Sequence, residues 1–142
     1  MKFYYETMPR YSDFDKMGIL HNSKYAILYE EGRLAMAIST GYSFEEITKN
    51  NITIVISEAK YCYKKPIFDI DKIIVELWIV YIKTYSIKIA FKITTDNGKT
   101  LNAIGYSIQA AINSQTKKLC KIPINAATMW SKYIDAEKIS FR

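Results

Sequence analysis

The sequence contains few of the residues on which metal and disulfide chemistry depend. Its 142 residues include only two cysteines, Cys62 and Cys120, and a single histidine, His21. The cysteines lie far apart in strand-like segments, and one histidine cannot complete a zinc site with them. We therefore expect free, buried thiols, no metal site and no cofactor.

Long apolar runs and the usual nucleotide and nucleophile motifs are also missing. The N-terminal segment has no apolar run of signal-peptide length, and the longest apolar region, Ile73 to Ile82, is interrupted by Glu76. We therefore expect a soluble, cytoplasmic protein without a membrane partner. There is no glycine-rich phosphate loop, and neither Gly41 nor Gly105 begins a complete Gly-x-Ser-x-Gly motif. Nucleotide-dependent redox, phosphoryl transfer and serine-nucleophile mechanisms are disfavoured.

Arginine is scarce although the chain is basic. The net charge is +6, but only 3 of the 20 basic residues are arginine, the residue that nucleic-acid readers favour for bidentate contacts. Most lysines are expected to form a solvated surface, and nucleic acid is not an expected partner. Two small clusters are candidates for binding the phosphates of a soluble cofactor-like substrate: Lys60, Lys64 and Lys65, and Lys117, Lys118 and Lys121.

Apolar and aromatic side chains are abundant. The chain is 49% hydrophobic and contains 12 tyrosines, with only 3 prolines and 5 glycines. This composition predicts an ordered chain, and a protein of this length buries roughly 68% of its unfolded surface. We expect a single domain over residues 1–142.

The first third of the sequence predicts a strand and a long helix. Residues 2–11 are strand-like, and Asn22 or Ser23 can cap a helix that Gly41 ends. Ser43 begins a capping-box pattern, which predicts a short second helix before the chain turns at residues 50–51. The apolar stripe of the long helix consists of Tyr25, Leu28, Tyr29, Gly32, Ala35 and Met36.

From Ile52 onward the apolar period changes to two, which predicts strands. Strands are expected from Ile52, over residues 73–83, around residues 87–94 and over residues 100–113, with a hairpin turn at Asp96-Asn97-Gly98-Lys99. A terminal helix is expected over about 125–138. The predicted fold class is α+β, a curved antiparallel sheet of about five strands wrapped around one long central helix.

The segment from Asp13 to Arg33 combines an Asp-x-Asp pair, a glycine turn and a helix start. In an extended segment Asp13 and Asp15 point in opposite directions, so only one of them can face a given site. A carboxylate beside a helix N-terminus can activate water or attack a carbonyl while the helix amides stabilise an oxyanion. We interpret this segment as an active site.

These residues resemble the hotdog-fold thioesterases of the 4-hydroxybenzoyl-CoA thioesterase-like family. That family has Asp-x-Asp, a glycine-containing loop, a tyrosine ten residues after the second Asp, and a helix of the type Tyr/Phe-Glu-x-Ala-Arg. The matching positions here are Asp13, Asp15, Gly18, Tyr25, Tyr29, Glu30 and Arg33, with Gly32 where alanine is usual, and the match continues through residues 55–60, Lys65-Pro66, Asp69, Asp71 and residues 121–123.

The resemblance implies hydrolysis of an acyl thioester, from acyl-CoA or acyl-carrier protein, at sites on the interface of a homodimer or homotetramer. It implies that Asp15 is the catalytic carboxylate, acting as nucleophile or through water. It also implies that the backbone amide of Asn22 polarises the carbonyl, a contribution of about 2.7 to 4 kcal/mol.

The same resemblance bears on several other residues of the segment. His21 occupies a different position from the histidine of many bacterial members, and is either a catalytic positioning or proton-handling group or a loop residue. Glu30 is expected to orient the catalytic groups, with a role as a second catalytic base as the alternative. Tyr25 and Tyr29 are core aromatics whose hydroxyls could reach an acyl pocket. The expected substrate-binding residues are Gly18, Tyr25, Tyr29, Lys60, Lys64 and Lys65.

Two other functions have features of the sequence that bear on them. A non-catalytic acyl-CoA-binding module is suggested by the displaced His21. A hotdog hydratase is disfavoured, because it needs a histidine five residues after the aspartate, and His21 is six residues after Asp15. The acyl group itself is not defined by the sequence.

Overall fold

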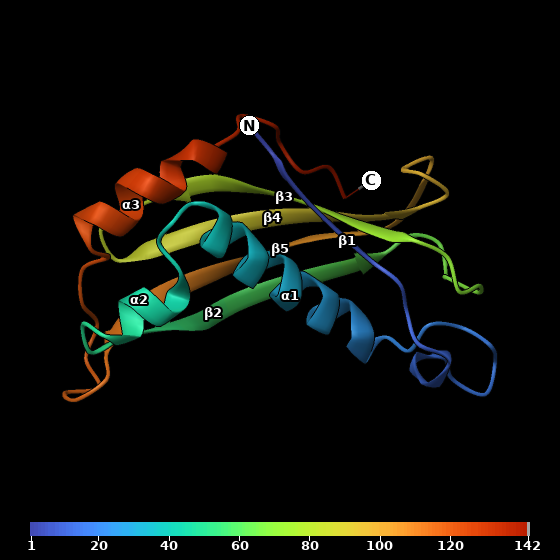
Figure 1. Cartoon of the computed structure of the whole chain (residues 1–142), viewed down its shortest axis with the longest axis horizontal. Helices are drawn as coiled ribbons and strands as arrows, with labels where there is room; N and C mark the ends of the chain where they lie inside the picture. The colour runs from blue at the N-terminus through green and yellow to red at the C-terminus, as the bar shows by residue number, and fades with distance from the viewer. Residues whose placement is uncertain (142) are drawn as a thin grey trace.

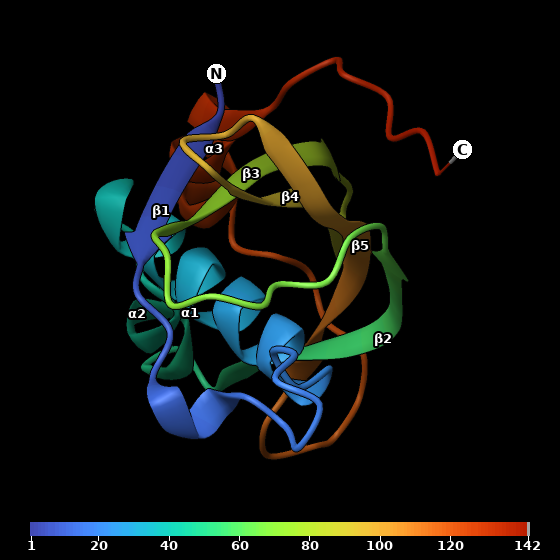
Figure 2. The same ribbon diagram turned by 90° about the vertical axis from the view of Figure 1, so that its right-hand side faces the viewer.

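The computed structural model describes residues 1–141, which form one five-stranded antiparallel sheet in the order β1-β3-β4-β5-β2. The long helix α1 lies in the concavity of this sheet, as Figures 1 and 2 show. The elements are β1 (Phe3–Thr7), η1 (Tyr11–Asp13), α1 (Ser23–Ser39), α2 (Phe44–Thr48), β2 (Ile52–Tyr63), β3 (Ile73–Ile82), β4 (Ser86–Thr95), β5 (Thr100–Asn113), α3 (Ile124–Trp130) and η2 (Ser131–Tyr133). The predicted sheet wrapped around one long helix is confirmed.

Capping and turn residues define several of the helix and strand ends. The α1 helix ends before Gly41, whose φ of +86° is the left-handed conformation that glycine adopts without strain. The hydroxyl of Ser43 accepts a hydrogen bond from the Glu46 amide at 3.3 Å and so caps α2. The β4–β5 turn has positive φ at Asp96, Asn97 and Gly98, as expected for a hairpin signal.

The C-terminal helix is shorter than the helix predicted over 125–138. It runs from Ile124 to Trp130 and gives way to the 3-10 turn η2. Ile134 then forms a parallel bridge with Ile79, and the Asp135 amide donates to the Ile79 carbonyl at 3.0 Å. Helical spacing of apolar residues predicted continued helix, but the free edge of β3 beyond the end of β1 takes these backbone groups instead.

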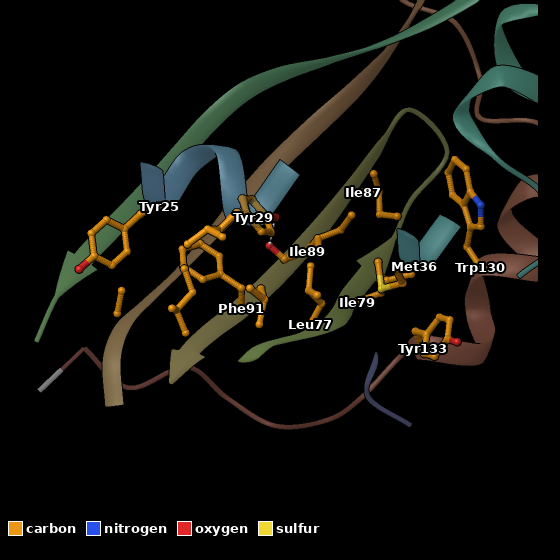
Figure 3. Close-up of a cluster of buried hydrophobic side chains, with 14 of the residues drawn as sticks. Tyr25, Tyr29, Met36, Leu77, Ile79, Ile87, Ile89, Phe91, Trp130 and Tyr133 are labelled. Carbon is orange, nitrogen blue, oxygen red and sulfur yellow. Dashed lines mark hydrogen bonds between the residues drawn. The ribbon is translucent and has the colours of Figure 1, made fainter. Parts of the chain in front are cut away.

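The core lies between the buried face of α1 and strands β3 to β5. Figure 3 shows the row of buried side chains, with Tyr25 at one end and Trp130 and Tyr133 at the other. Gly32 permits the close approach of α1 to β3, because a Cβ atom there would lie 2.9 Å from Leu77 Cδ1.

The two edges of the sheet differ in length. β1 forms a short edge of five residues, whereas β2 spans 12 residues and pairs only with β5 among the described strands. The middle of β2 is exposed, including Val55 and Ile56, which are 38% and 48% exposed. A long, apolar, unpaired edge favours pairing with another strand.

No helix in the part of the chain that the structure describes is long and apolar enough to cross a membrane. Cys62 and Cys120 are both free and half-buried.

Candidate active site

The Asp15 carboxylate is held by its own turn. Its Oδ1 atom accepts hydrogen bonds from the amides of Met17 at 2.8 Å and Ile19 at 3.1 Å. Gly18 completes the turn with a φ of +75°, and the Gly18 amide donates to the Asp15 carbonyl. Asp15 is exposed, and within residues 1–141 its Oδ2 atom takes no hydrogen bond. The turn therefore orients a carboxylate that has one oxygen free for chemistry.

Asp13 has a different role from Asp15. Its Oδ2 atom accepts from the Arg10 amide at 2.8 Å, and its Oδ1 atom lies 3.4 Å from Lys24 Nζ. The Asp13 backbone carbonyl accepts from the His21 amide and ties the loop to the start of α1. These contacts make Asp13 a structural residue, as expected if the two aspartates point in opposite directions.

His21 caps the start of α1 in place of the predicted Asn22 or Ser23 side chain. The His21 Nδ1 atom accepts from the Ser23 amide at 3.1 Å and lies 2.8 Å from Ser23 Oγ. The His21 carbonyl accepts from the Lys24 amide. Because Nδ1 is an acceptor here, the neutral ring carries its proton on Nε2.

The backbone amide of Asn22, at the start of α1, is available to donate a hydrogen bond to a ligand. Asn22 itself has helical backbone angles, and its side chain caps nothing. Its amide donates to no acceptor within the described chain, so it is one of the orphan N–H groups of a helix N-terminus. Such an amide can donate to a carbonyl oxygen of a ligand.

Asn22 lines a small cavity of about 220 Å³ at the start of α1. The cavity is bordered by Ile19, Leu20, Asn22, Tyr25, Tyr63, Lys64, Lys65 and Pro66. Ile19 is also the residue whose amide holds Asp15, so the carboxylate turn adjoins the cavity wall. Burial is the main cause that raises the pKa of the Tyr25 hydroxyl, so this residue is neutral at physiological pH.

Three of the predicted site residues lie away from this cavity. Tyr29 is fully buried, and its hydroxyl donates to the Ile89 carbonyl at 2.8 Å, so it serves the core (Figure 3). Lys60 Nζ lies 4.0 Å from the centre of the Phe141 ring, on the opposite face of β2 from Tyr61, which is partly buried and packs against the core. Glu30 is exposed and borders a second, larger cavity.

The second cavity contains two buried polar residues that the sequence did not predict to lie in a common site. It has a volume of about 380 Å³ and is lined by Glu30, Arg33, Leu34, Phe44, Glu45, Thr48, Ile52, Thr53, Ile54, Ile56 and Gln109. Arg33 and Gln109 are buried, and each has a buried polar atom without a partner in the described structure. The family resemblance includes Arg33 in the helix motif but gives it no role in a site, and no sequence signal pointed to Gln109.

The class of fold is defined by comparison with solved structures. A protein from Staphylococcus aureus, SAV2348, solved in complex with CoA, superposes with a TM-score of 0.87 at 18% identity, over 99% of this chain and 90% of that one. A DHNA-CoA thioesterase from Staphylococcus aureus gives a TM-score of 0.82 at 25% identity, over 92% of this chain and 89% of the other. The sheet and helix described above are the hotdog fold.

The chain belongs to the thioesterase-like superfamily, whose family model matches residues 9–130. Among curated relatives, the "Putative acyl-CoA thioesterase YneP" of Bacillus subtilis is 29% identical over 70 residues, which is 49% of this chain and 51% of that protein. A "Putative esterase" of Aquifex aeolicus is 33% identical over 69 residues, which is 48% of this chain and 53% of the relative. The matched segment thus spans about half the length of these curated relatives.

Proposed function

We propose that this protein hydrolyses an acyl thioester, releasing a carboxylic acid and a free thiol, with Asp15 as the catalytic carboxylate. The observation that carries the proposal is that a carboxylate oxygen and a backbone amide, both without a hydrogen-bond partner in the described chain, occur close to the start of the same helix. Asp15 presents a free Oδ2 atom from a rigid turn, and the turn leads into a helix whose Asn22 amide is a free donor beside a cavity.

The chemistry follows from these two groups. The thioester carbonyl oxygen accepts a hydrogen bond from the Asn22 amide, which stabilises the oxyanion as a tetrahedral intermediate forms. Asp15 takes a proton from a water molecule whose oxygen attacks the carbonyl carbon. Collapse of the intermediate breaks the C–S bond, and the thiolate leaves and takes up a proton.

Direct attack by Asp15 is the alternative route to the same products. The carboxylate oxygen then forms a transient mixed anhydride and releases the thiolate, and water hydrolyses the anhydride. The labelling differs when water attacks the Asp15 carbonyl of the anhydride, because the product acid then keeps an oxygen from the Asp15 carboxylate. After a single turnover in ¹⁸O-labelled water, label in the Asp15 carboxylate therefore indicates the anhydride route.

We infer that the working unit is a homodimer formed by pairing of two β2 edges. Asp15 is exposed in the single chain, whereas efficient acyl transfer needs a site from which bulk water is excluded. The unpaired edge of β2, with its exposed Val55 and Ile56, is a self-complementary surface of the kind that two-fold pairing buries. Further association to a tetramer is compatible with this unit.

The leaving group is proposed to be CoA or an acyl-carrier protein. Lys64 and Lys65 border the cavity at Asn22 and can pair with phosphate groups, which both carriers possess. The structural neighbours named as a DHNA-CoA thioesterase and as a CoA complex support CoA. A CoA substrate also agrees with the cytoplasmic location expected from the sequence.

The proposal is tested by release of free thiol from a panel of short, medium, long and aromatic acyl-CoAs. Turnover of at least one substrate, at a rate that scales with enzyme concentration, is expected. Tight binding of acyl-CoA without turnover of any acyl-CoA or acyl-carrier-protein substrate would contradict hydrolysis. That result would favour a non-catalytic acyl-CoA-binding module.

A further inference from the structure

The last described residues of the chain form an extended segment on the outer face of the sheet. Figures 1 and 2 show the red end of the chain outside the sheet, on the side away from α1. Burial alternates along residues 135–141, which is the period of an extended chain that lies with one side on a surface. The half-buried members are Asp135, Glu137, Ile139 and Phe141, and the exposed members are Ala136, Lys138 and Ser140. Residues 135–141 are hereafter called the C-terminal strap.

The strap is anchored at Glu137, near its start. The Glu137 carboxylate forms ion pairs with Lys2 and Lys92, and its backbone carbonyl accepts a hydrogen bond from Trp78 Nε1 at 3.2 Å. Trp78 lies on the outer face of β3, since the neighbouring Leu77 belongs to the core on the inner face, yet Trp78 is 0% exposed. Glu137 and the two lysines, whose ammonium groups lie 4.8 and 5.6 Å from the ring centre, therefore cover this tryptophan.

The tip of the strap covers two lysines that the sequence predicts to bind substrate. Lys60 Nζ faces the ring of Phe141, and Lys64 Nζ donates a hydrogen bond to the Phe141 carbonyl. The Tyr106 ring packs edge-on against the same phenylalanine, with 6.1 Å between the ring centroids. Lys64 also borders the cavity that contains Asn22. One residue of the strap thus holds two ammonium groups beside the candidate active-site cavity.

The anchor and the tip differ in the strength of their contacts. The side chains in the two ion pairs of Glu137 are only 18–32% exposed, so solvent screens these pairs in part. Lys60 and Lys64 are exposed, and a neutral carbonyl and an aromatic ring hold them. A phosphate group carries the negative charge that these two partners lack, so it pairs with an ammonium group more strongly than either of them. A phosphate can therefore displace the tip while Glu137 stays in place.

We propose that the tip of the C-terminal strap is an internal competitor of CoA, because Phe141 and the CoA phosphates bind the same ammonium groups, those of Lys60 and Lys64. This inference rests on the proposed function and concerns the regulation of the same site. The tip lowers the affinity for CoA in the substrate and in the released product alike. Its closure over the two lysines therefore favours the departure of free CoA after hydrolysis.

Calorimetric titration with CoA, which contains no thioester to hydrolyse, measures this competition directly. Phe141→Ala removes the ring that contacts Lys60 and Tyr106 and so weakens the closed tip. Apparent Kd is the intrinsic Kd divided by the fraction of open molecules, so a tip closed in about two-thirds to nine-tenths of molecules predicts about 3- to 10-fold tighter binding by Phe141→Ala. Ser140→Ala, in the same strap but with an exposed side chain, is the matched control and should bind like wild type. Unchanged, weaker or absent CoA binding by Phe141→Ala would refute the competition.

The role of the phosphates is tested with an acyl-CoA and the N-acetylcysteamine thioester of the same acyl group, which lacks every phosphate. Phe141→Ala is expected to lower KM for the acyl-CoA about 3- to 10-fold and to leave KM for the other thioester unchanged. An equal effect on both thioesters would refute competition for phosphate-binding lysines, because it would indicate a change in the cavity itself. In a Lys60→Met background the effect of Phe141→Ala on CoA binding should shrink, and an undiminished effect would also refute the proposal.

The anchor is tested by tryptophan fluorescence during the same titration. If only the tip moves, Trp78 stays covered by Glu137 and the emission maximum does not shift when CoA saturates the protein. The second tryptophan, Trp130, belongs to the core on the inner face of the sheet. A red shift would therefore report exposure of Trp78 and would refute displacement confined to the tip.

Failure of this inference is distinguishable from failure of the proposed function, because CoA binding does not depend on hydrolysis. Wild type without turnover on any thioester, or full activity of Asp15→Asn, contradicts the proposed function whatever the calorimetry shows. Turnover that depends on Asp15, together with unchanged CoA binding by Phe141→Ala, contradicts only the inference. Circular dichroism of each variant confirms that it folds.

Discussion

Removal of a single buried oxygen atom, in Tyr29→Phe, tests the hydrogen-bonded centre of the fold. The ring keeps its packing, since Phe91 lies 4.4 Å away between ring centroids. The variant loses the donor to the Ile89 carbonyl and the acceptor for the Ser107 hydroxyl, both in a fully buried setting. Leaving buried polar groups unpaired costs about 1–3 kcal/mol, and we expect a loss of that size near pH 8.

The same substitution has a pH dependence with a defined sign. Burial is the main cause that raises the pKa of Tyr29 well above its ordinary value, so folded Tyr29 stays protonated in mild alkali. In the unfolded chain it ionises near pH 10. The wild type therefore loses stability above that pH, by about 1.4 kcal/mol at pH 11 from this residue, whereas Tyr29→Phe does not.

Urea unfolding at pH 8 and pH 11 measures both effects. The stability difference between wild type and Tyr29→Phe should shrink by about 1.4 kcal/mol between the two pH values. Other tyrosines and lysines titrate in both proteins and cancel in the difference. Tyr4→Phe, at a site 59% exposed, is the matched control for removal of a tyrosine hydroxyl from the surface. A pH-independent difference for Tyr29→Phe would refute the reasoning.

Three further changes test the site region. Gly18→Ala places a side chain at a φ of +75° and should lower the free energy of unfolding in urea by about 1 kcal/mol. Because the substitution strains the turn that holds Asp15, kcat should also fall, and an unchanged kcat would contradict this role of the turn. His21→Ala should lose about 1 kcal/mol of thermal stability with the helix cap, whereas His21→Asn, which keeps an acceptor, should lose less; equal losses would argue against capping. Arg33→Met should leave the unfolding free energy unchanged or raise it, because no ion pair is broken; a loss of about 3–5 kcal/mol would instead indicate a hidden partner for the guanidinium.

Much of the fold could be predicted from local sequence signals. The hairpin at residues 96–99 and the ends of β5 are set by turn residues and by alternation, which act over a few neighbouring positions. The C-terminal helix was predicted too long because its apolar spacing says nothing about the free backbone edge of β3, which takes up Ile134. Competition between a helix and a distant sheet edge is a tertiary effect.

The parts of the candidate site that are formed by residues close in sequence were predictable, and the parts that depend on tertiary structure were not. The Asp15 turn and the start of α1 are formed by residues close in sequence, so their spacing located both. His21 as the helix cap was not predicted, because histidine is a rare cap and its role depends on ring orientation. Arg33 and Gln109 come from different elements, and only the folded sheet brings them to one cavity.

The most direct test of the central claim compares thiol release by wild type, Asp15→Asn and Asp13→Asn on the best acyl-CoA of the panel. Asn at position 15 retains an Oδ1 acceptor for the Met17 and Ile19 amides, so the turn should survive without the carboxylate. We predict that kcat falls by about 10²–10⁴-fold in Asp15→Asn and stays within a few-fold in Asp13→Asn. Full activity of Asp15→Asn would contradict the assignment of Asp15 as the catalytic carboxylate.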